Sequence, residues 1–241
     1  MRPVEKKNVG ETVSYVNSCN QTVTETIQEN YSPYNKAKMP LLGNLGWYCS
    51  YCEGTRLPNE LAVEHIEPKG ANGEKTAWEN FLVSCGICNS IKGYPEIHEE
   101  DYHWPHKDNT FRDFIYTAGG AVLLNPNLDE DEKNKAKKLF DLVKLGAYPG
   151  NGIEPTSRDF RWKKRLETWD LAERLRNKFN AGTADVDEII SMAQKLGYWS
   201  VWFTVFKGYD EVRRRLICDF SGTCTSCFEA NNHYEPIKRN G

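Results

Sequence analysis

The sequence CSYCEG at residues 49–54 and the sequence CGICNS at residues 85–90 decide how this chain folds, because each contains a CxxC pair. An interval of 32 residues separates the pairs, whose members are Cys49, Cys52, Cys85 and Cys88. The two thiolates of one pair can bind a single ion, and two pairs complete the tetrahedron that structural zinc prefers. The interval is longer than in a simple zinc ribbon, so we expect an insert that holds the function.

A bound Zn²⁺ also has an energetic role in this part of the chain. A module of about fifty residues buries too little apolar surface to fold easily alone, whereas structural zinc contributes roughly 10 to 16 kcal/mol. Two other interpretations of the cysteines are a thioredoxin-like redox pair and unrelated thiols. The two matched pairs, without a βαβ pattern around them, favour zinc.

The composition is that of a folded protein with no membrane segment. Hydrophobic residues make up 39% of the 241 residues, and the chain has twelve Tyr and seven Trp, which argues against disorder. The start, MRPVEKKNVGETVSY, lacks the apolar stretch of a secretory signal. The longest apolar run, residues 198–206, is shorter than the roughly 20 residues of a membrane span. We therefore expect a cytoplasmic protein, where closely spaced cysteines are more often metal ligands or redox groups than disulfides.

Charge is divided unevenly along the chain. The net charge of −3 is unusual for a protein that binds nucleic acid unaided. Residues 53–101 hold ten acids and four bases, whereas residues 157–179 hold eight bases and four acids. The basic segment predicts nucleic-acid or partner contacts at Arg158, Arg161 and Lys164, although a charged helix face is often only solvated.

Three regions follow from the sequence pattern, and together they predict an α+β fold. Residues 1–44 form a polar N-terminal arm, expected outside the core and in contact with a partner. Residues 45–110 form the cysteine-bearing module. Residues 111–241 form a mainly helical region for partner docking, with a hairpin around Gly119 and Gly120 and helices predicted over 129–146, from about 160 to 179, and over 185–196.

Within the insert, LAVEHIEPKG at residues 61–70 reads as a short strand that ends at Glu64 and His65, before Pro68. Adjacent residues on a regular strand point to opposite faces, so these two can serve one site only at a frayed or twisted strand end. Neutral imidazole, with a pKa near 6.5, can take a proton from water at cellular pH. His65 is therefore the candidate general base.

Further residues of the module complete a site for phosphodiester hydrolysis. The oxygens of Glu64 and Asn89 suit Mg²⁺ or Mn²⁺. We expect Asn80 to brace the His65 loop and Lys92, three residues after Asn89, to contact phosphate. Taken singly, each residue has a simpler structural role, as an exposed His, a capping Asn or a solvated Glu. Their order between the two cysteine pairs favours catalysis.

This order resembles the HNH, or ββα-metal, nuclease family: a CxxC pair, an acid–His pair, an Asn in WENFLV, and CxxC–Asn followed by a basic residue. The resemblance covers about a fifth of the chain. It implies a zinc-stabilised ββα module with structural zinc on the four cysteines, His65 as general base, Glu64 and Asn89 as ligands of the catalytic ion, and Asn80 as the brace. The family more often has Asp where this chain has Glu64.

A looser likeness extends beyond the module. MRPVEK, LGWYCSYCE and LLNPN resemble the HNH subunit of Septu-type anti-phage systems, including those attached to retrons. The likeness implies an ABC-type ATPase partner and, in retron systems, a reverse transcriptase with its DNA–RNA product. It agrees with the acidic module and with the absence of a GxxxxGK[ST] phosphate-binding loop from the sequence, because nucleic-acid binding and ATP switching would then come from another subunit.

Near the C-terminus a second series could bind zinc: Cys218, Cys224, Cys227 and His233. The alternative is a set of free thiols in a mobile tail. For the whole chain, two other functions remain open: a stand-alone restriction or homing-type HNH enzyme, and a zinc-binding adaptor without catalysis. The sequence does not separate DNA from RNA as the substrate.

Overall fold

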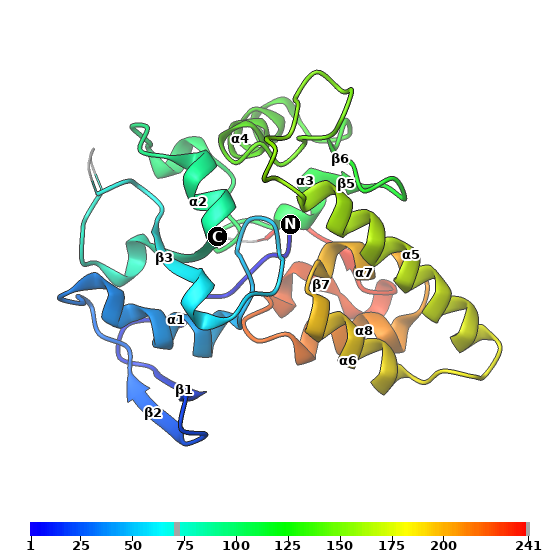
Figure 1. Ribbon diagram of the computed structural model, residues 1–241, viewed down its shortest axis with the longest axis horizontal. Helices are drawn as coiled ribbons and strands as arrows, with labels where there is room; N and C mark the ends of the chain where they lie inside the picture. Colours follow the sequence, from blue (N-terminus) through cyan, green and yellow to red (C-terminus); the bar gives the residue numbers. More distant parts are fainter. Residues whose placement is uncertain (70–72, 240–241) are drawn as a thin grey trace.

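A computed structural model describes residues 1–69 and 73–239, in which helices are mixed with small antiparallel sheets (Figure 1). This mixture agrees with the predicted α+β class. The strands pair in sequence order, two by two: β1 Thr12–Val16 with β2 Thr22–Thr26, β3 Leu61–His65 with β4 Phe81–Cys85, β5 Phe114–Tyr116 with β6 Val122–Leu124, and β7 Phe228–Glu229 with β8 Glu235–Pro236. The helices are α1 Lys38–Leu45, α2 Gly86–Lys92, α3 Thr110–Asp113, α4 Glu130–Leu142, α5 Arg161–Asn180, α6 Val186–Leu196, α7 Trp199–Val205 and α8 Asp210–Asp219.

The segment between the two cysteine pairs forms the β3–β4 sheet, and α2 follows directly. The register pairs Leu61 with Cys85 and His65 with Phe81, so β4 runs away from the His65 end and α2 then returns toward it. All five residues of β4 are buried. The strand therefore has the continuous apolar character of an element covered on both faces.

The N-terminal region differs from the predicted arm, because it packs into the core. Met1 and Val4 are buried, as is Val13 of the β1–β2 hairpin. Strand β1 packs against α1, which begins two residues before Pro40 and ends at Gly46, where φ is +79°. A proline is tolerated in the first turn of a helix because the amide there needs no helical partner. The expectation that residues 1–44 lie outside the core is therefore wrong.

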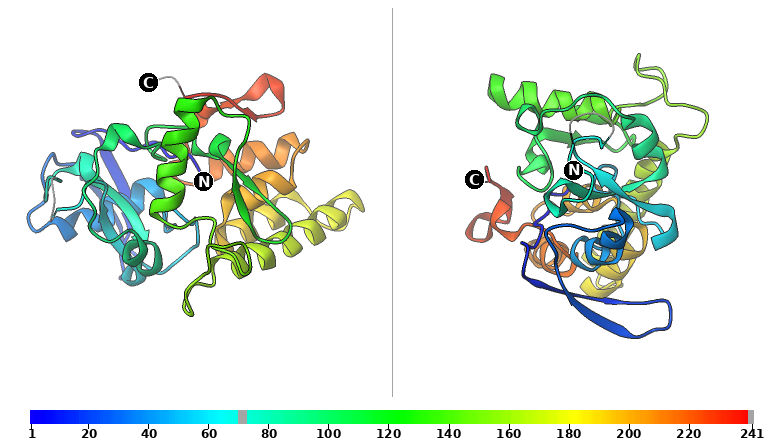
Figure 2. Two further views of the ribbon diagram at one scale, coloured as in Figure 1. Left: turned by 90° about the horizontal axis from the view of Figure 1, so that it is seen from above. Right: turned by 90° about the vertical axis from the view of Figure 1, so that its left-hand side faces the viewer.

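One continuous hydrophobic core joins the cysteine-bearing module to the C-terminal helices. Residues just after the first CxxC pair contact the junction of α6 and α7, where the Tyr198 amide donates to the Glu53 carbonyl at 2.9 Å. A Cβ atom at Gly197, where φ is +74°, would lie 2.3 Å from that carbonyl oxygen. Only glycine permits this approach. Figure 2 shows the last described residues beside α4, where Lys238 forms a 3.0 Å ion pair with Glu132.

The predicted C-terminal elements are present, although their buried faces differ in detail. Helix α4 starts after Asp129, whose side chain caps the Glu132 amide. The apolar residues of α5 recur at helical spacing, which predicts one buried face: Trp162, Leu166, Trp169, Ala172, Leu175 and Phe179. Ala172 and Leu175 are buried as this pattern predicts, whereas the other four are half-buried, and Arg161, Arg165 and Thr168 are buried beside them. None of the helices described here is both long and apolar enough to cross a membrane.

Candidate functional site

The four cysteines of the two CxxC pairs meet in one buried cluster. Their sulfur atoms all lie within 4.8 Å of one another, and the Cys52 and Cys85 sulfurs are 3.8 Å apart. A tetrahedral site with metal–sulfur bonds of about 2.3 Å places its sulfurs about 3.8 Å apart. The cluster therefore has the ligands and the dimensions that Zn²⁺ requires.

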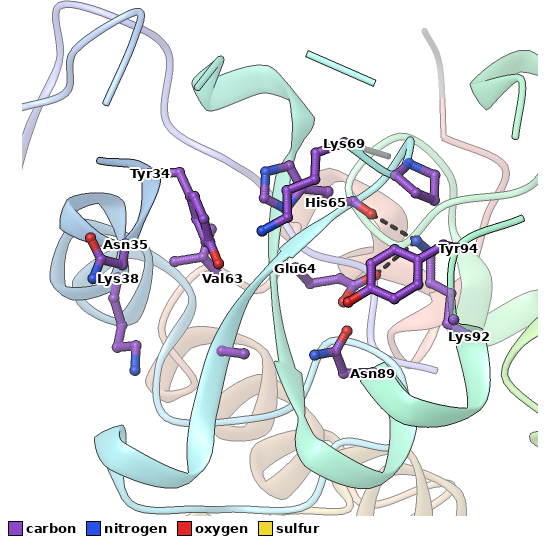
Figure 3. Close-up of a pocket in the computed structure, with 13 residues that line it drawn as sticks. Tyr34, Asn35, Lys38, Val63, Glu64, His65, Lys69, Asn89, Lys92 and Tyr94 are labelled. Atoms are coloured by element: carbon purple, nitrogen blue, oxygen red, sulfur yellow. Dashed lines mark hydrogen bonds and ion pairs between the residues drawn. The ribbon is translucent and has the colours of Figure 1, made fainter. Parts of the chain in front are cut away.

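A separate cavity of about 170 Å³ lies along β3 and extends to its His65 end. Cys85 pairs with Leu61 at one end of the ladder and His65 lies at the other, four residue steps or roughly 13 Å away at the rise of a strand. Glu64, His65 and Asn89 all line this cavity, as Figure 3 shows. The cysteine cluster thus supports the cavity without forming part of it.

Strand position explains how neighbouring residues reach one cavity. Four consecutive residues of β3, from Ala62 to His65, line it, although Cβ atoms alternate between the faces of a strand. Strand β3 pairs only with β4 in its two-stranded sheet, so its other edge is free of a partner strand within the described part of the chain. The cavity lies against that edge, where side chains from both faces of β3 can reach it. Strand β3 ends at His65, as the sequence predicts, and its end is not frayed, because Glu64 and His65 are both paired in the ladder.

The ring of His65 is held in one orientation. Its Nε2 lies 3.0 Å from the Lys75 carbonyl oxygen, which can only accept, so Nε2 carries the proton and Nδ1 keeps a lone pair. Tyr34 and Phe81 contact the ring edge-on, with centroids 4.9 and 5.1 Å away. Burial, opposed by the hydrogen bond to Lys75, lowers the pKa of His65 below its usual 6.5. The ring is thus neutral near pH 7, as a general base must be.

Glu64 is paired with a lysine from α2. The Lys92 ammonium contacts Glu64 Oε1 at 2.8 Å and the His65 carbonyl at 2.7 Å, and both side chains are buried. Burial raises the pKa of Glu64 above its usual 4.5, and Lys92 opposes this effect. Lys92 contacts Oε1, and no hydrogen bond or ion pair from residues 1–69 or 73–239 reaches the second carboxylate oxygen. Lys92 therefore positions Glu64 and ties α2 to the end of β3.

Asn80 closes the loop that follows His65. Its amide oxygen accepts from the Glu67 amide at 2.8 Å, and its Nδ2 donates to the Glu67 and Glu74 carbonyls at 2.9 and 2.8 Å. Lys75, whose carbonyl fixes the His65 ring, directly follows Glu74 in the chain. This geometry is what a bracing role requires.

Replacing Asn80 with alanine should lower the free energy of unfolding by about 2 to 3 kcal/mol, at about 1 kcal/mol for each lost hydrogen bond. Urea unfolding of the zinc-loaded protein measures this change. The matched control is Asn89→Ala, because Asn89 is exposed and surface changes stay within about 0.5 kcal/mol. Equal effects of the two substitutions would contradict the bracing role of Asn80.

Sequence reasoning missed four residues that also line the cavity: Tyr34, Lys38, Lys69 and Tyr94. The Lys69 ammonium lies 4.1 Å from the centroid of the Tyr34 ring, a cation–π contact. Tyr94 follows Gly93 directly after α2 and is 75% exposed. The closeness of Lys69 and Tyr94 to the motif was a usable signal. Tyr34 gave none, since it lies 31 positions before His65.

The four basic residues predicted to contact nucleic acid differ in their exposure to solvent. Arg158 and Lys164 are exposed, so their predicted role stays open, and Lys164 forms an ion pair with Glu167. Arg161 is 4% exposed and Lys92 is equally buried, with its ammonium on Glu64. The buried and fully paired Arg161 is not placed to contact nucleic acid, whereas Lys92 lines the cavity, so its phosphate contact stays a prediction. Charge along the sequence did not distinguish a solvated base from a buried one.

The second predicted zinc series does not assemble. Cys218 is exposed on α8, and His233 contacts Asp210 at 2.9 Å. The Cys224 and Cys227 sulfurs are 3.1 Å apart, shorter than the edge of a zinc tetrahedron. Across residues 1–69 and 73–239, the cluster of the first two CxxC pairs is the one place where three or more potential metal-ligand atoms converge. The prediction of a second zinc site is wrong for this structure.

A comparison with protein families matches one part of the chain. The family model for HNH endonuclease matches residues 49–94. This range includes the four clustered cysteines, the loop braced by Asn80 and the β3 and α2 residues of the cavity. No curated protein matches the chain. The matched domain supports a nuclease function.

Proposed function

We propose that this chain is a metal-dependent HNH endonuclease that hydrolyses phosphodiester bonds of nucleic acid. The observation that carries the proposal is the convergence of Glu64, His65 and Asn89 on one cavity along β3, the strand whose first residue pairs with Cys85 of the cysteine cluster. Zn²⁺ on the cysteines would hold the sheet and α2 together. Mg²⁺ or Mn²⁺ on the oxygens of Glu64 and Asn89 would stabilise charge on the phosphate and on the leaving oxygen.

In this mechanism Nδ1 of His65 accepts a proton from the attacking water. The Lys75 carbonyl holds the opposite ring nitrogen, so the lone pair cannot turn away from the cavity without breaking that bond. Lys92 keeps the Glu64 carboxylate in place, and Asn80 holds the loop that presents the Lys75 carbonyl. Lys69, on the Tyr34 ring, supplies positive charge at the cavity for a substrate phosphate.

We further propose that the nuclease is the effector of an anti-phage defence complex, controlled by an ATPase partner. The resemblance of MRPVEK, LGWYCSYCE and LLNPN to Septu-type and retron-associated HNH subunits supports this role. So does the acidic charge of residues 53–101, because a subunit that binds nucleic acid poorly alone needs a partner to deliver the substrate.

A zinc-binding adaptor without catalysis is the second candidate, and the Glu64–Lys92 pair favours it. A carboxylate already neutralised by a buried ammonium at 2.8 Å can serve a purely structural role. An adaptor would retain zinc and bind its partner, and it would cleave nothing.

A cleavage assay separates these functions. The purified chain is incubated with plasmid, single-stranded DNA and total RNA, with Mg²⁺ or Mn²⁺ or with EDTA, and with or without its ATPase. The proposal predicts cleavage that needs the divalent ion and increases with the ATPase. A stand-alone enzyme would cut at full rate without the partner. Absence of cleavage from the complete complex on every substrate would leave the adaptor.

The acidic limb of the cleavage rate should be centred below pH 6.5, because burial lowers the pKa of His65 below its usual 6.5 and the neutral ring is the active form. The logarithm of kcat/KM against pH measures this limb. The unfolded chain binds the proton more readily, so folding stability also falls below pH 6.5. Melting temperatures over the same range separate the two effects. An acidic limb centred above pH 6.5 would contradict the assignment.

A further inference from the structure

Arg161, the first residue of α5, lies beside the cysteine cluster although 73 positions separate it from Cys88. Its Nη1 is 3.5 Å from the Cys88 sulfur, within the distance of an N–H···S hydrogen bond. The side chain is 4% exposed. A guanidinium from the C-terminal helical region therefore reaches a sulfur atom of the module.

The remaining contacts fix this guanidinium in place. Nε and Nη2 donate to the two carboxylate oxygens of Asp159 at 2.8 and 2.7 Å. Nη1 also donates to the Val143 carbonyl at 2.9 Å, and Nη2 to the Lys144 carbonyl at 3.0 Å. With the Cys88 sulfur these contacts use all five N–H donors of arginine. The Nη1 group thus cannot turn away from Cys88 without breaking other hydrogen bonds.

The chemistry of a tetrathiolate explains what this contact can do. Four thiolates and one Zn²⁺ carry a net charge of −2, and a buried charge needs hydrogen-bond donors around it. Donors in the layer outside the ligands fix the orientation of the ligands and tune the metal site. A lysine or an apolar residue would not reproduce the planar fork of arginine.

We propose that Arg161 is a positioning residue of the cysteine metal site: it donates a hydrogen bond to the metal-bound Cys88 thiolate and slows loss of the metal. Through this contact the start of α5 closes the site from outside the HNH segment. The inference concerns metal retention and does not depend on the chain being a nuclease.

The test compares full-length variants loaded with zinc. Asp159→Asn combined with Arg161→Met removes the buried ion pair as a unit, and Arg161→Lys keeps the charge but offers fewer donors. A chromophoric chelator measures zinc affinity by competition and the rate of release. We expect about 10- to 100-fold weaker zinc binding and faster release in both variants. Lys164→Met, on an exposed position of the same helix, should match the unchanged protein.

Two outcomes distinguish this role from a merely structural one. In the protein loaded with Co²⁺, the thiolate-to-metal charge-transfer band should shift in Arg161→Lys and not in Lys164→Met, because the charge on a ligand sulfur has changed. Unchanged zinc affinity and an unshifted band in Arg161→Lys would overturn the proposal, as would equal losses of melting temperature in the zinc-loaded and zinc-free proteins. If the double variant does not fold, Arg161→Lys decides the result by itself.

Discussion

Replacing His65 with alanine is expected to lower kcat for nucleic-acid cleavage by about 10²- to 10⁴-fold, the usual contribution of a positioned general base. The Nδ1 atom of His65 is available as the base, since Nε2 is bound to the Lys75 carbonyl. Alanine leaves the carboxylate of Glu64, the cysteine cluster and the backbone pairing of β3 in place. Initial rates on a labelled substrate, at saturating Mg²⁺ or Mn²⁺, measure the loss.

The control for this variant is His98→Ala. His98 is 57% exposed, with its Nε2 3.7 Å from a Glu96 carboxylate oxygen, so its loss should leave the rate unchanged. Zinc content and melting temperature must be equal in the two variants, so that a slower rate reports chemistry and not unfolding. A His65→Ala protein that cleaves as fast as the His98→Ala protein would remove His65 from the mechanism.

The sequence predicted the features that depend on short-range spacing. The two CxxC pairs predicted a four-sulfur cluster, and their sulfurs converge as a tetrahedral ion requires. Asn80 was expected to brace the His65 loop, and it makes three backbone hydrogen bonds there. Both results follow because ligand spacing and loop closure are local, and the residue types themselves limit what can form.

Features that depend on tertiary packing could not be predicted in this way. Arg161 was expected to face nucleic acid, yet it is buried against Cys88, because Asp159 and two backbone carbonyls satisfy its charge and donors. In the first half of α5, Arg165 and Thr168 are buried and their apolar neighbours are only half-buried, whereas Ala172 and Leu175 further along are buried as the sequence pattern predicts. Tyr34, which packs on His65, comes from a region whose polar composition predicted an arm. The composition of a segment predicts whether its residues are exposed on average. It does not show which basic residue is buried with hydrogen-bond partners for all its donors.

Removing the metal from the cysteine cluster, by chelation or by Cys85→Ser, is expected to unfold the β3–β4–α2 segment and abolish cleavage. Structural zinc contributes roughly 10 to 16 kcal/mol in small zinc domains, as much as the whole stability of a typical domain. The rest of the protein cannot compensate for such a loss. Helices α4 to α8 have apolar contacts of their own, so we expect them to keep part of their structure.

Circular dichroism and hydrogen exchange by segment measure this result, because the first reports total helix content and the second locates the unfolding. The matched control is Cys19→Ser, since Cys19 is an exposed cysteine outside the cluster. The amides of β3 and β4 should exchange fast in Cys85→Ser and slowly in Cys19→Ser, while those of α7 stay protected in both. If zinc-free protein kept slow exchange in β3 and β4, packing on the shared core would be the stronger of the two forces that hold His65 in place, and the metal would have a role other than structural support.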